Sequence, residues 1–159
     1  MVNETLRFRH GGAPHAELEA LRWPEWFGLC RRGPLSQIAA EFPFFGEVSR
    51  SRRHVARQLR CRPASVVSAW GGDVRLATTA WAISSIIAYW LGWPNDRFIP
   101  NDPTIVVFGG PPGTDLIFEQ ALCDISENLG VPMERVEDAL KMPRFGDFVL
   151  VIAAGAAAR

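Results

Sequence analysis

The chain has 159 residues, of which 48% are apolar and 21% are charged, a composition typical of one soluble globular domain or of a small domain with an extension. This composition excludes disorder, collagen-like repeats and low-complexity tails. Seventeen basic residues balance seventeen acidic ones, so the overall charge indicates neither a polyanion-binding protein nor a strongly acidic one.

The balanced total conceals a difference between two parts of the chain. Residues 1–72 contain eleven arginines and six acids, whereas residues 73–159 contain six basic residues and eleven acids. The first part therefore has a net charge of +5 and the second a net charge of −5. We predict an arginine-rich, irregular helical extension over 1–72 and a separate small helical bundle over 73–159.

The cysteines indicate the compartment. Cys30, Cys61 and Cys123 are widely spaced and include no C-x-x-C pair, which is the pattern of neither a disulfide framework nor a zinc cluster. The first residues contain no apolar segment of the kind that a secretory signal needs. We therefore expect reduced thiols in a cytoplasmic protein, and no metal site.

The N-terminal part begins with segments that prolines interrupt. Residues 16–32 have the composition of a helix, which Pro24 must kink or divide because proline lacks the amide donor and collides with the preceding turn. Residues 35–48 predict a short helix and an aromatic cluster at 42–45.

Residues 50–62 form the most basic stretch of the chain, with six arginines, one histidine and no acid. As a helix, this stretch would bury Val55 and Leu59 on one face and spread the arginines over the rest. Three interpretations stay open: a solvated basic face, a contact with the acidic part or a partner, and a nucleic-acid surface. No nucleic-acid recognition motif accompanies the stretch. The arginines that we select as candidates are Arg52, Arg53 and Arg57.

A long apolar helix is predicted over 74–91. Asp73 precedes it as an N-cap, and Gly92 with Pro94 ends it. The uncharged stretch 76–95 is close to the length that spans a bilayer. Four hydroxyl side chains dilute it, so we predict a buried core helix and no membrane contact.

The next segments alternate between clear and ambiguous signals. Prolines and Asn-Asp pairs predict a fixed loop over 93–103. Residues 104–108 are apolar and β-branched, which suits a short strand or a buried loop segment. Residues 148–152 also suit a strand, and the alanines after them suit a helix. An α+β fold is therefore the alternative to a mainly α-helical one.

Residues 115–129 form the clearest helix. Its apolar positions recur at i, i+3, i+4, i+7 and i+11 from Phe118, as on one buried helix face. Thr114 or Asp115 would cap its start and Gly130 its end. A short helix is predicted over 134–140.

One apparent catalytic motif lacks the residues that its chemistry needs, and a second stays open. The run GGPPGT at 109–114 is similar to a phosphate-binding loop, but an aspartate and two apolar residues follow where the lysine and hydroxyl ligands are needed. A Cys-His pair such as Cys30 with His54 stays open because such partners meet in space rather than in sequence. No other catalytic pattern is present.

The C-terminal part resembles an acyl carrier protein. The stretch TDLIFEQALCDISENLGVPMERVEDALKMPRFGDFVLVIAA is similar to the family's second, third and fourth helices. The register places Phe118-Glu119-Gln120 on the second helix, Val131-Pro132 before the short acidic third helix, and Phe145-Gly146-Asp147-Phe148 at the entry to the fourth. The resemblance implies a four-helix fold, with 74–91 as its first helix, and an acidic face for basic partner enzymes.

The sequence departs from the family at the attachment position. Carrier proteins attach phosphopantetheine to the serine of an Asp-Ser-Leu triplet, and this register places Gly113, Thr114 and Asp115 there. Thr114 keeps a hydroxyl, so it is the degenerate phosphopantetheine position. We expect it to act as an N-cap, without the arm.

These observations predict a carrier-like or protein-binding module rather than an enzyme. Between Phe98 and Glu134 the chain has six acids and no basic residue, which suits a partner protein with a basic docking surface. A small enzyme and a nucleic-acid-associated protein are the alternatives. The acidic candidates for partner binding are Asp115, Glu119, Asp124 and Glu127.

Overall fold

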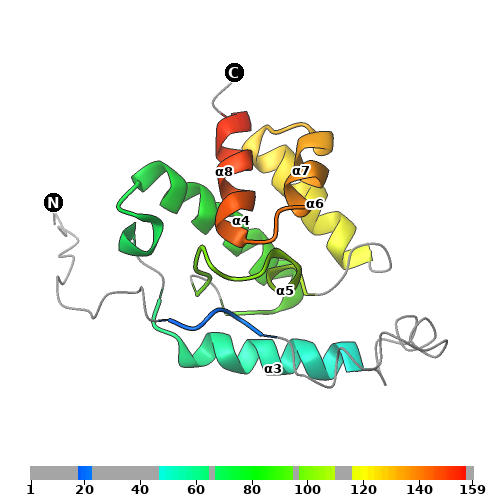
Figure 1. The fold of residues 1–159 in the computed structure, drawn as a ribbon. Coiled ribbons are helices and arrows are strands. Elements are labelled where there is room, and N and C mark those ends of the chain that lie inside the picture. Colours follow the sequence, from blue (N-terminus) through cyan, green and yellow to red (C-terminus); the bar gives the residue numbers. More distant parts are fainter. Residues whose placement is uncertain (1–17, 23–46, 65–66, 95–96, 110–115, 157–159) are drawn as a thin grey trace, which may run out of the picture.

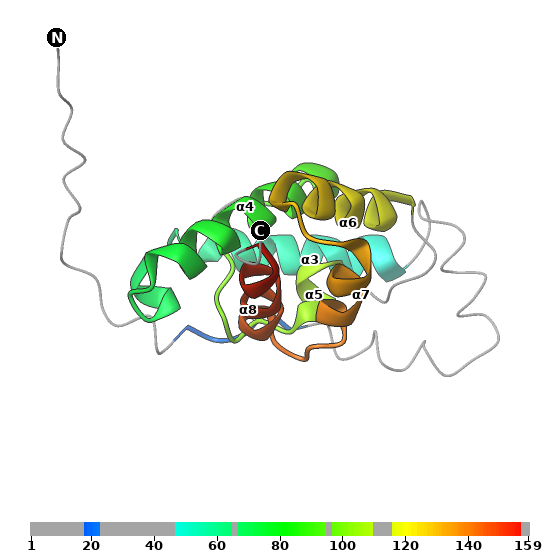
Figure 2. The ribbon, with the colours of Figure 1, turned by 90° about the horizontal axis from the view of Figure 1, so that it is seen from above.

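The computed structural model describes residues 18–22, 47–64, 67–94, 97–109 and 116–156, and over these residues the protein is mainly helical, as predicted. The elements in chain order are α3 (Glu47–Cys61), the short 3-10 helix η2 (Val67–Trp70), α4 (Val74–Leu91), α5 (Thr104–Val107), α6 (Leu116–Leu129), α7 (Met133–Leu140) and α8 (Phe145–Ala156). Helix α3 lies along one side of the molecule, and α4, α6, α7 and α8 are grouped on the other (Figure 1). Seen from above, α3 passes beneath the other helices (Figure 2).

Helix α4 has the bounds and the caps that its sequence predicts. The Asp73 carboxylate accepts hydrogen bonds from the amides of Arg75 and Leu76, at 2.9 and 3.1 Å. These two amides have no partner inside the helix, so the cap satisfies groups that would otherwise depend on water. Gly92 ends the helix with a φ of 66°, a left-handed conformation that glycine adopts without steric cost.

The α+β alternative is wrong for the described residues. Residues 104–107 form α5, and residues 148–152 lie inside α8. Helix α8 buries Phe145, Phe148, Val149 and Ile152, which share one helical face, and a short apolar run of this kind does not distinguish strand from helix by periodicity. One antiparallel bridge between Pro103 and Arg144 is the only strand-like pairing in this part of the chain.

Aromatic rings fill the centre of the helical group. Phe145 lies 5.7 Å from Phe98 and 5.9 Å from Trp70, and Phe148 lies 5.0 Å from Phe108, measured between ring centroids. Phe98, Phe145 and Phe148 are almost fully buried. The α8 rings therefore contact the loop before α5, the 3-10 helix and the end of α5 in one core.

The first turn of α4 lies against the C-terminal end of α8. Arg75, in the first turn of α4, donates from Nη2 to the carbonyl of Ala153 near the end of α8, at 2.5 Å. The last four carbonyls of a helix lack intrahelical partners, and a cation there also interacts favourably with the helix dipole. The first turn of α4 thus caps the end of α8.

Residues 18–22, the described part of the stretch expected to be helical, form no helix. This segment lies beside α3, where Gln58 exchanges two hydrogen bonds with the backbone of Arg22, at 2.7 and 3.1 Å. The Leu21 amide donates a hydrogen bond to the Asp102 carboxylate. Tertiary hydrogen bonds therefore replace the intrahelical ones that the local composition favours. Residues 16–17 and 23–32 lie outside the described residues, as does the predicted aromatic cluster at 42–45.

Residues from both predicted parts of the chain contribute to one core. Leu21, Val55 and Leu59 from the first part are fully buried in the same cluster as Ile83 and Ile125 from the second. The buried face of α3 thus packs against the helical group. The boundary at residue 72 stays a prediction.

Helix α4 is the one helix in the described ranges that is long and apolar enough to cross a membrane, by length and composition only. It buries Ala80, Ile83, Ser84, Ile87 and Ala88. About 28% of this 18-residue window is buried, so α4 covers the core with one face and exposes the opposite one.

Candidate functional site

Helix α6 presents an acidic face, which we define as Leu116, Glu119, Gln120, Cys123 and Glu127. The buried residues of α6 are Phe118, Ala121, Leu122 and Ile125, so the residues of the acidic face occupy the other side of the helix. Glu119 and Glu127 are exposed, and Leu116 is 83% exposed although it is apolar. Two predicted partner-binding acids therefore lie on one surface with an apolar side chain.

Asp124, the third described acid of this set, has a partner inside the molecule. Its carboxylate accepts a hydrogen bond of 2.6 Å from Nε1 of Trp90 in α4 and a longer one of 3.5 Å from Gln120. Asp124 is half-buried. This side chain therefore connects α6 to α4, and partner binding through α6 would depend on Glu119 and Glu127.

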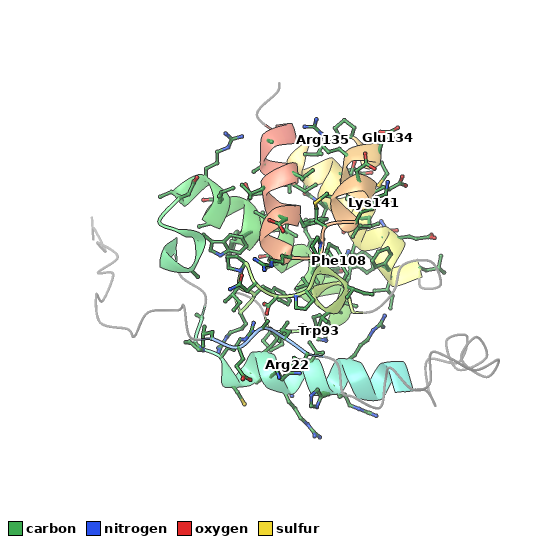
Figure 3. The ribbon with its side chains drawn as sticks, in the orientation of Figure 1. Arg22, Trp93, Phe108, Glu134, Arg135 and Lys141 are labelled. Carbon is green, nitrogen blue, oxygen red and sulfur yellow. The ribbon has the colours of Figure 1, made fainter. Side chains whose placement is uncertain are left out.

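Helix α7 adds three exposed acids, Glu134, Glu137 and Asp138. Lys141, just after the helix, approaches Asp138 to 2.6 Å. The hydrogen bond to Asp138, together with the charge of that carboxylate, raises the pKa of Lys141 above its ordinary value of 10.5. Figure 3 shows Glu134 at the far end of α7 from Lys141. Glu134 thus lies away from Lys141, and its neighbour in the chain is the exposed Arg135.

Thr114 and Asp115 lie outside the described residues. The degenerate phosphopantetheine position and its predicted capping role therefore stay predictions from the sequence. The described part of α6 begins at Leu116, one residue from the predicted start.

The arginines in and just after α3 differ in burial. Val55, Ala56, Leu59 and Arg62 are buried, whereas Arg53, Arg57 and Arg60 are exposed at i, i+4 and i+7. We call these last three the arginine stripe. Residues with this spacing lie on one helix face, so the exposed guanidinium groups follow one another along the outside of α3.

Arg52, selected from the sequence together with Arg53 and Arg57, lies elsewhere. It is half-buried, and its Nε donates to the carbonyl of Gly109 at 3.0 Å. Gly109 follows α5 and has a φ of 78°. Arg52 therefore contacts the backbone at the start of the glycine-proline run, while Arg53 and Arg57 face solvent.

Arg62 and Asp102 form an ion pair in the interior. We call this pair, together with the backbone groups that bind to it, the Asp102 junction. The pair is bidentate, with Nη1 to Oδ2 at 2.7 Å and Nη2 to Oδ1 at 2.8 Å. Side-chain exposure is 8% for Arg62 and zero for Asp102. The fork geometry of an arginine matches a carboxylate in this way, and charge-assisted bonds of this length are strong.

Backbone groups complete the junction. The amides of Leu21 and Ile99 each donate to Asp102 at 2.9 Å, and the Asp102 carbonyl accepts from the amide of Phe145 at 2.8 Å. Arg62 also donates to the carbonyls of Glu19 and Arg97. The junction thus joins residues 19–21, the end of α3, the loop before α5 and the start of α8.

The chemistry of the junction is structural. A carboxylate offers about four acceptor positions, and each oxygen of Asp102 already accepts one bond from Arg62 and one from an amide. No acceptor position is left for a substrate. Sequence reasoning missed this pair, because it placed Arg62 with the basic stretch and Asp102 with the surface acids; the only local signal was the Asn-Asp-Pro at the end of the proline-rich loop.

Other chemistry in the described ranges is sparse. His54 is exposed on α3, and its candidate partner Cys30 lies outside these ranges. No group of three or more His, Cys, Asp or Glu side chains in the part of the chain that the structure describes is placed to hold a metal ion.

Comparison with protein-family models, with curated proteins and with solved structures finds no match for this chain.

Proposed function

We propose that this protein is a non-enzymatic, carrier-like or protein-binding module that presents the acidic face of α6 to a partner protein with a basic docking surface. The observation that carries the proposal is the 83% exposure of Leu116 beside the exposed Glu119. A partner can bury this apolar side chain, while the neighbouring acids direct the approach of a basic partner surface. The free thiols of Cys61 and Cys123 suit a cytoplasmic location.

The charge pattern of the sequence supports the same assignment. The stretch from Phe98 to Glu134 has no lysine or arginine, so no basic side chain of this stretch weakens the field over α6. Of its six acids, Asp102 is neutralised in the interior by Arg62. The exposed charges of Glu119 and Glu127 are available to make α6 complementary to a basic surface.

A photo-crosslinking experiment tests the docking face. A photoreactive amino acid replaces Gln120 in the full chain, and the same residue replaces Thr78 on α4 as a matched control on an exposed site. We expect crosslinked products from position 120 that disappear when Glu119 and Glu127 are both changed to arginine. Equal products from both positions, or products that persist after the charge reversal, contradict the proposal.

A second experiment separates a carrier from a binding module. The chain is co-expressed with a broad-specificity phosphopantetheinyl transferase, and its intact mass is measured for the wild type and for Thr114→Ser. We expect no added arm on the wild type, because the β-methyl of threonine crowds the hydroxyl and the flanking residues differ from the family triplet. Modification of the wild type would make the protein a carrier in the full sense.

The arginine stripe supports a second candidate function, nucleic-acid binding through α3. Three exposed guanidinium groups in a row match successive phosphates of a backbone, and each neutralised phosphate releases counterions on binding. If all three participate, the logarithm of the binding constant for duplex DNA falls with the logarithm of salt concentration with a slope of roughly −2.7. Fluorescence anisotropy of a labelled DNA duplex, titrated with the protein at several salt concentrations between about 50 and 200 mM, measures this slope.

The test variant changes the exposed arginines of α3 and keeps Arg52, which is half-buried. Changing Arg53, Arg57 and Arg60 together to alanine should abolish the salt-dependent binding and leave the fold intact, since all three are exposed. Arg52 is left in place because it bonds to Gly109. Binding that is absent in the wild type, or that survives the triple change, removes this second candidate.

A further inference from the structure

The exposed side of α4 carries a stripe without charge, which we call the α4 stripe: Val74, Thr78, Trp81, Ser85 and Tyr89. Val74 is 67% exposed, Trp81 57% and Tyr89 79%. The buried residues of α4 lie on the opposite face. Apolar side chains of this size grouped on one face of a soluble protein mark an interaction surface.

The two hydroxyl side chains of the stripe do not make it polar. Thr78 donates to the carbonyl of Val74 at 2.8 Å, and Ser85 donates to the carbonyl of Trp81 at 2.9 Å. Each hydroxyl hydrogen therefore bonds to a carbonyl of the same helix. Serine and threonine form such bonds readily in helices. The stripe therefore offers small side chains on either side of Trp81, and a second helix can approach closely there.

The stripe is complementary to itself when two copies of the helix run antiparallel. Positions 74 and 89, and positions 78 and 85, are placed symmetrically about the point between Trp81 and Ala82. A two-fold axis at that point would set Val74 of one copy against Tyr89 of the other, and Thr78 against Ser85. Trp81 would lie beside the axis in both copies. An isologous interface needs this self-complementarity, because the same patch serves both partners.

Spacing and electrostatics suit the same arrangement. Successive residues of the stripe are four, three, four and four positions apart, close to the seam spacing of paired helices. Antiparallel helices place the positive end of one dipole near the negative end of the other. No charged side chain belongs to the stripe, and Arg75 beside it donates to Ala153 of α8. Pairing thus brings no like charges together within the stripe.

The exposed area is near the lower limit for a specific dimer. Aromatic side chains bury about 150–250 Å² each, so the exposed fractions of Trp81 and Tyr89 leave roughly 300 Å² uncovered in each copy. Val74 and the surfaces around the small residues add to this in both copies. The total approaches the roughly 1,000 Å² that a biological interface needs. A dimer of this size is expected to be weak and to depend on concentration.

We infer that two copies of this chain associate through the α4 stripe as an antiparallel, two-fold symmetric pair of α4 helices. The acidic face of α6 and the arginine stripe of α3 lie on other helices, so the pairing does not depend on the proposed function. Each dimer would present two copies of each surface, which strengthens binding to any partner that has two matching sites.

Sedimentation velocity of the full chain between about 1 and 200 µM, a range that brackets a weak dimer, tests the association. We expect a shift from the 17.6 kDa monomer toward twice that mass as concentration rises. Trp81→Glu and Tyr89→Lys should each keep the chain monomeric over the whole range. Leu116→Glu, at an apolar position on α6 that is 83% exposed, should leave the dependence of the sedimentation coefficient on concentration unchanged.

Circular dichroism and urea unfolding of each variant establish that it is folded. Because Trp81 and Tyr89 are both mostly exposed, neither change should disturb the fold. A wild type that is monomeric at every concentration overturns the inference, since another segment or a lipid surface would then be the occupant of the stripe. Dimerisation that Trp81→Glu leaves intact, or that Leu116→Glu abolishes, overturns it as well.

Mixed crosslinking tests the register. Thr78→Cys and Ser85→Cys chains are prepared separately and oxidised alone and as a mixture, with the wild type measuring the background from its own cysteines. The antiparallel register predicts a disulfide-linked dimer above background in the mixture and much less in either variant alone. Equal linkage in all three samples contradicts the register.

Discussion

Asp102 and Arg62 place two opposite charges where water does not reach. Burying a charge costs several kcal/mol unless it is paired and hydrogen-bonded, and here both conditions are met by four bonds to the carboxylate. A pair of this kind stabilises little in comparison with an apolar substitute of the same shape. Its effect lies in what happens when one partner is lost.

Changing Asp102 to asparagine should therefore destabilise the protein strongly. The neutral side chain leaves the Arg62 guanidinium buried without a counterion, and loss of one member of a buried pair costs about 3–5 kcal/mol. Urea unfolding measures the change as a lower midpoint. The matched control is Asp138→Asn, which removes an exposed pair with Lys141 and should hardly move the midpoint. Equal shifts in the two variants would contradict the structural role of the junction.

Gly146 makes a second prediction at the residue scale. Alanine inside a helix is ordinarily more stable than glycine by about 0.5–1 kcal/mol. A Cβ at position 146, however, would lie 2.8 Å from Cβ of Pro100 and 3.1 Å from both its Cα and its carbonyl oxygen. The Gly146 amide also donates to that carbonyl at 2.9 Å, so neither backbone can withdraw without losing a bond.

We therefore expect Gly146→Ala to lower the stability by about 1–3 kcal/mol, the usual cost of overpacking. Thermal and urea unfolding give the value. Gly155→Ala serves as the comparison, because the nearest atom there is Cδ of Arg135, which belongs to a flexible side chain on the surface. If Gly146→Ala proves as stable as the wild type, the close approach of α8 to the loop at Pro100 is not as described.

At the scale of elements, the helices whose ends have local signals were predicted with their bounds. Asp73 and Gly92 delimit α4, and Gly130, with a φ of 62°, follows α6. These signals act within one or two turns, so sequence alone contains them. The runs at 104–108 and 148–152 have no such signal, and their helical state depends on the core around Phe108 and Phe148.

The candidate site was predictable only in part, for a related reason. The exposure of Glu119 and Glu127 follows from the periodicity of α6. Three other contacts join residues that are far apart in the sequence. Trp90 and Asp124 are 34 positions apart, Arg62 and Asp102 are 40 apart, and Arg52 and Gly109 are 57 apart. No local pattern encodes such pairings, and the same holds for the side of α4 that stays exposed.

The cap of α4 is the prediction that belongs to this scale. Removing the Asp73 carboxylate leaves the amides of Arg75 and Leu76 to water, so Asp73→Ala should cost about 0.5–2 kcal/mol. Asp73→Ser should recover most of the loss, because a serine oxygen accepts the same bonds. Urea unfolding of the three proteins compares them. An alanine variant with wild-type stability would mean that the exposed cap contributes nothing to α4.

At the scale of the whole molecule, the division of charge along the chain does not coincide with a division of the core. The first 72 residues are basic and the remainder acidic, yet Arg62 of the first part binds Asp102 of the second. Val55 and Leu59 of α3 are buried in the same cluster as the helices that follow. The charge difference therefore describes surfaces, while the interior joins both parts.

This arrangement predicts the behaviour of a fragment that contains residues 73–159 alone. Without α3 the fragment loses the apolar face of Val55 and Leu59 and the counterion of Asp102, and the apolar area exposed in their place destabilises the compact state. We expect a broad, weakly cooperative urea transition at a lower midpoint than that of the full chain, with increased binding of a hydrophobic dye. Asp102→Asn in the fragment should change little, because its partner is already absent, whereas the same change in the full chain is costly. A fragment that unfolds cooperatively at the midpoint of the full chain would establish residues 73–159 as an independent domain and would reduce the Asp102 junction to a surface attachment of α3.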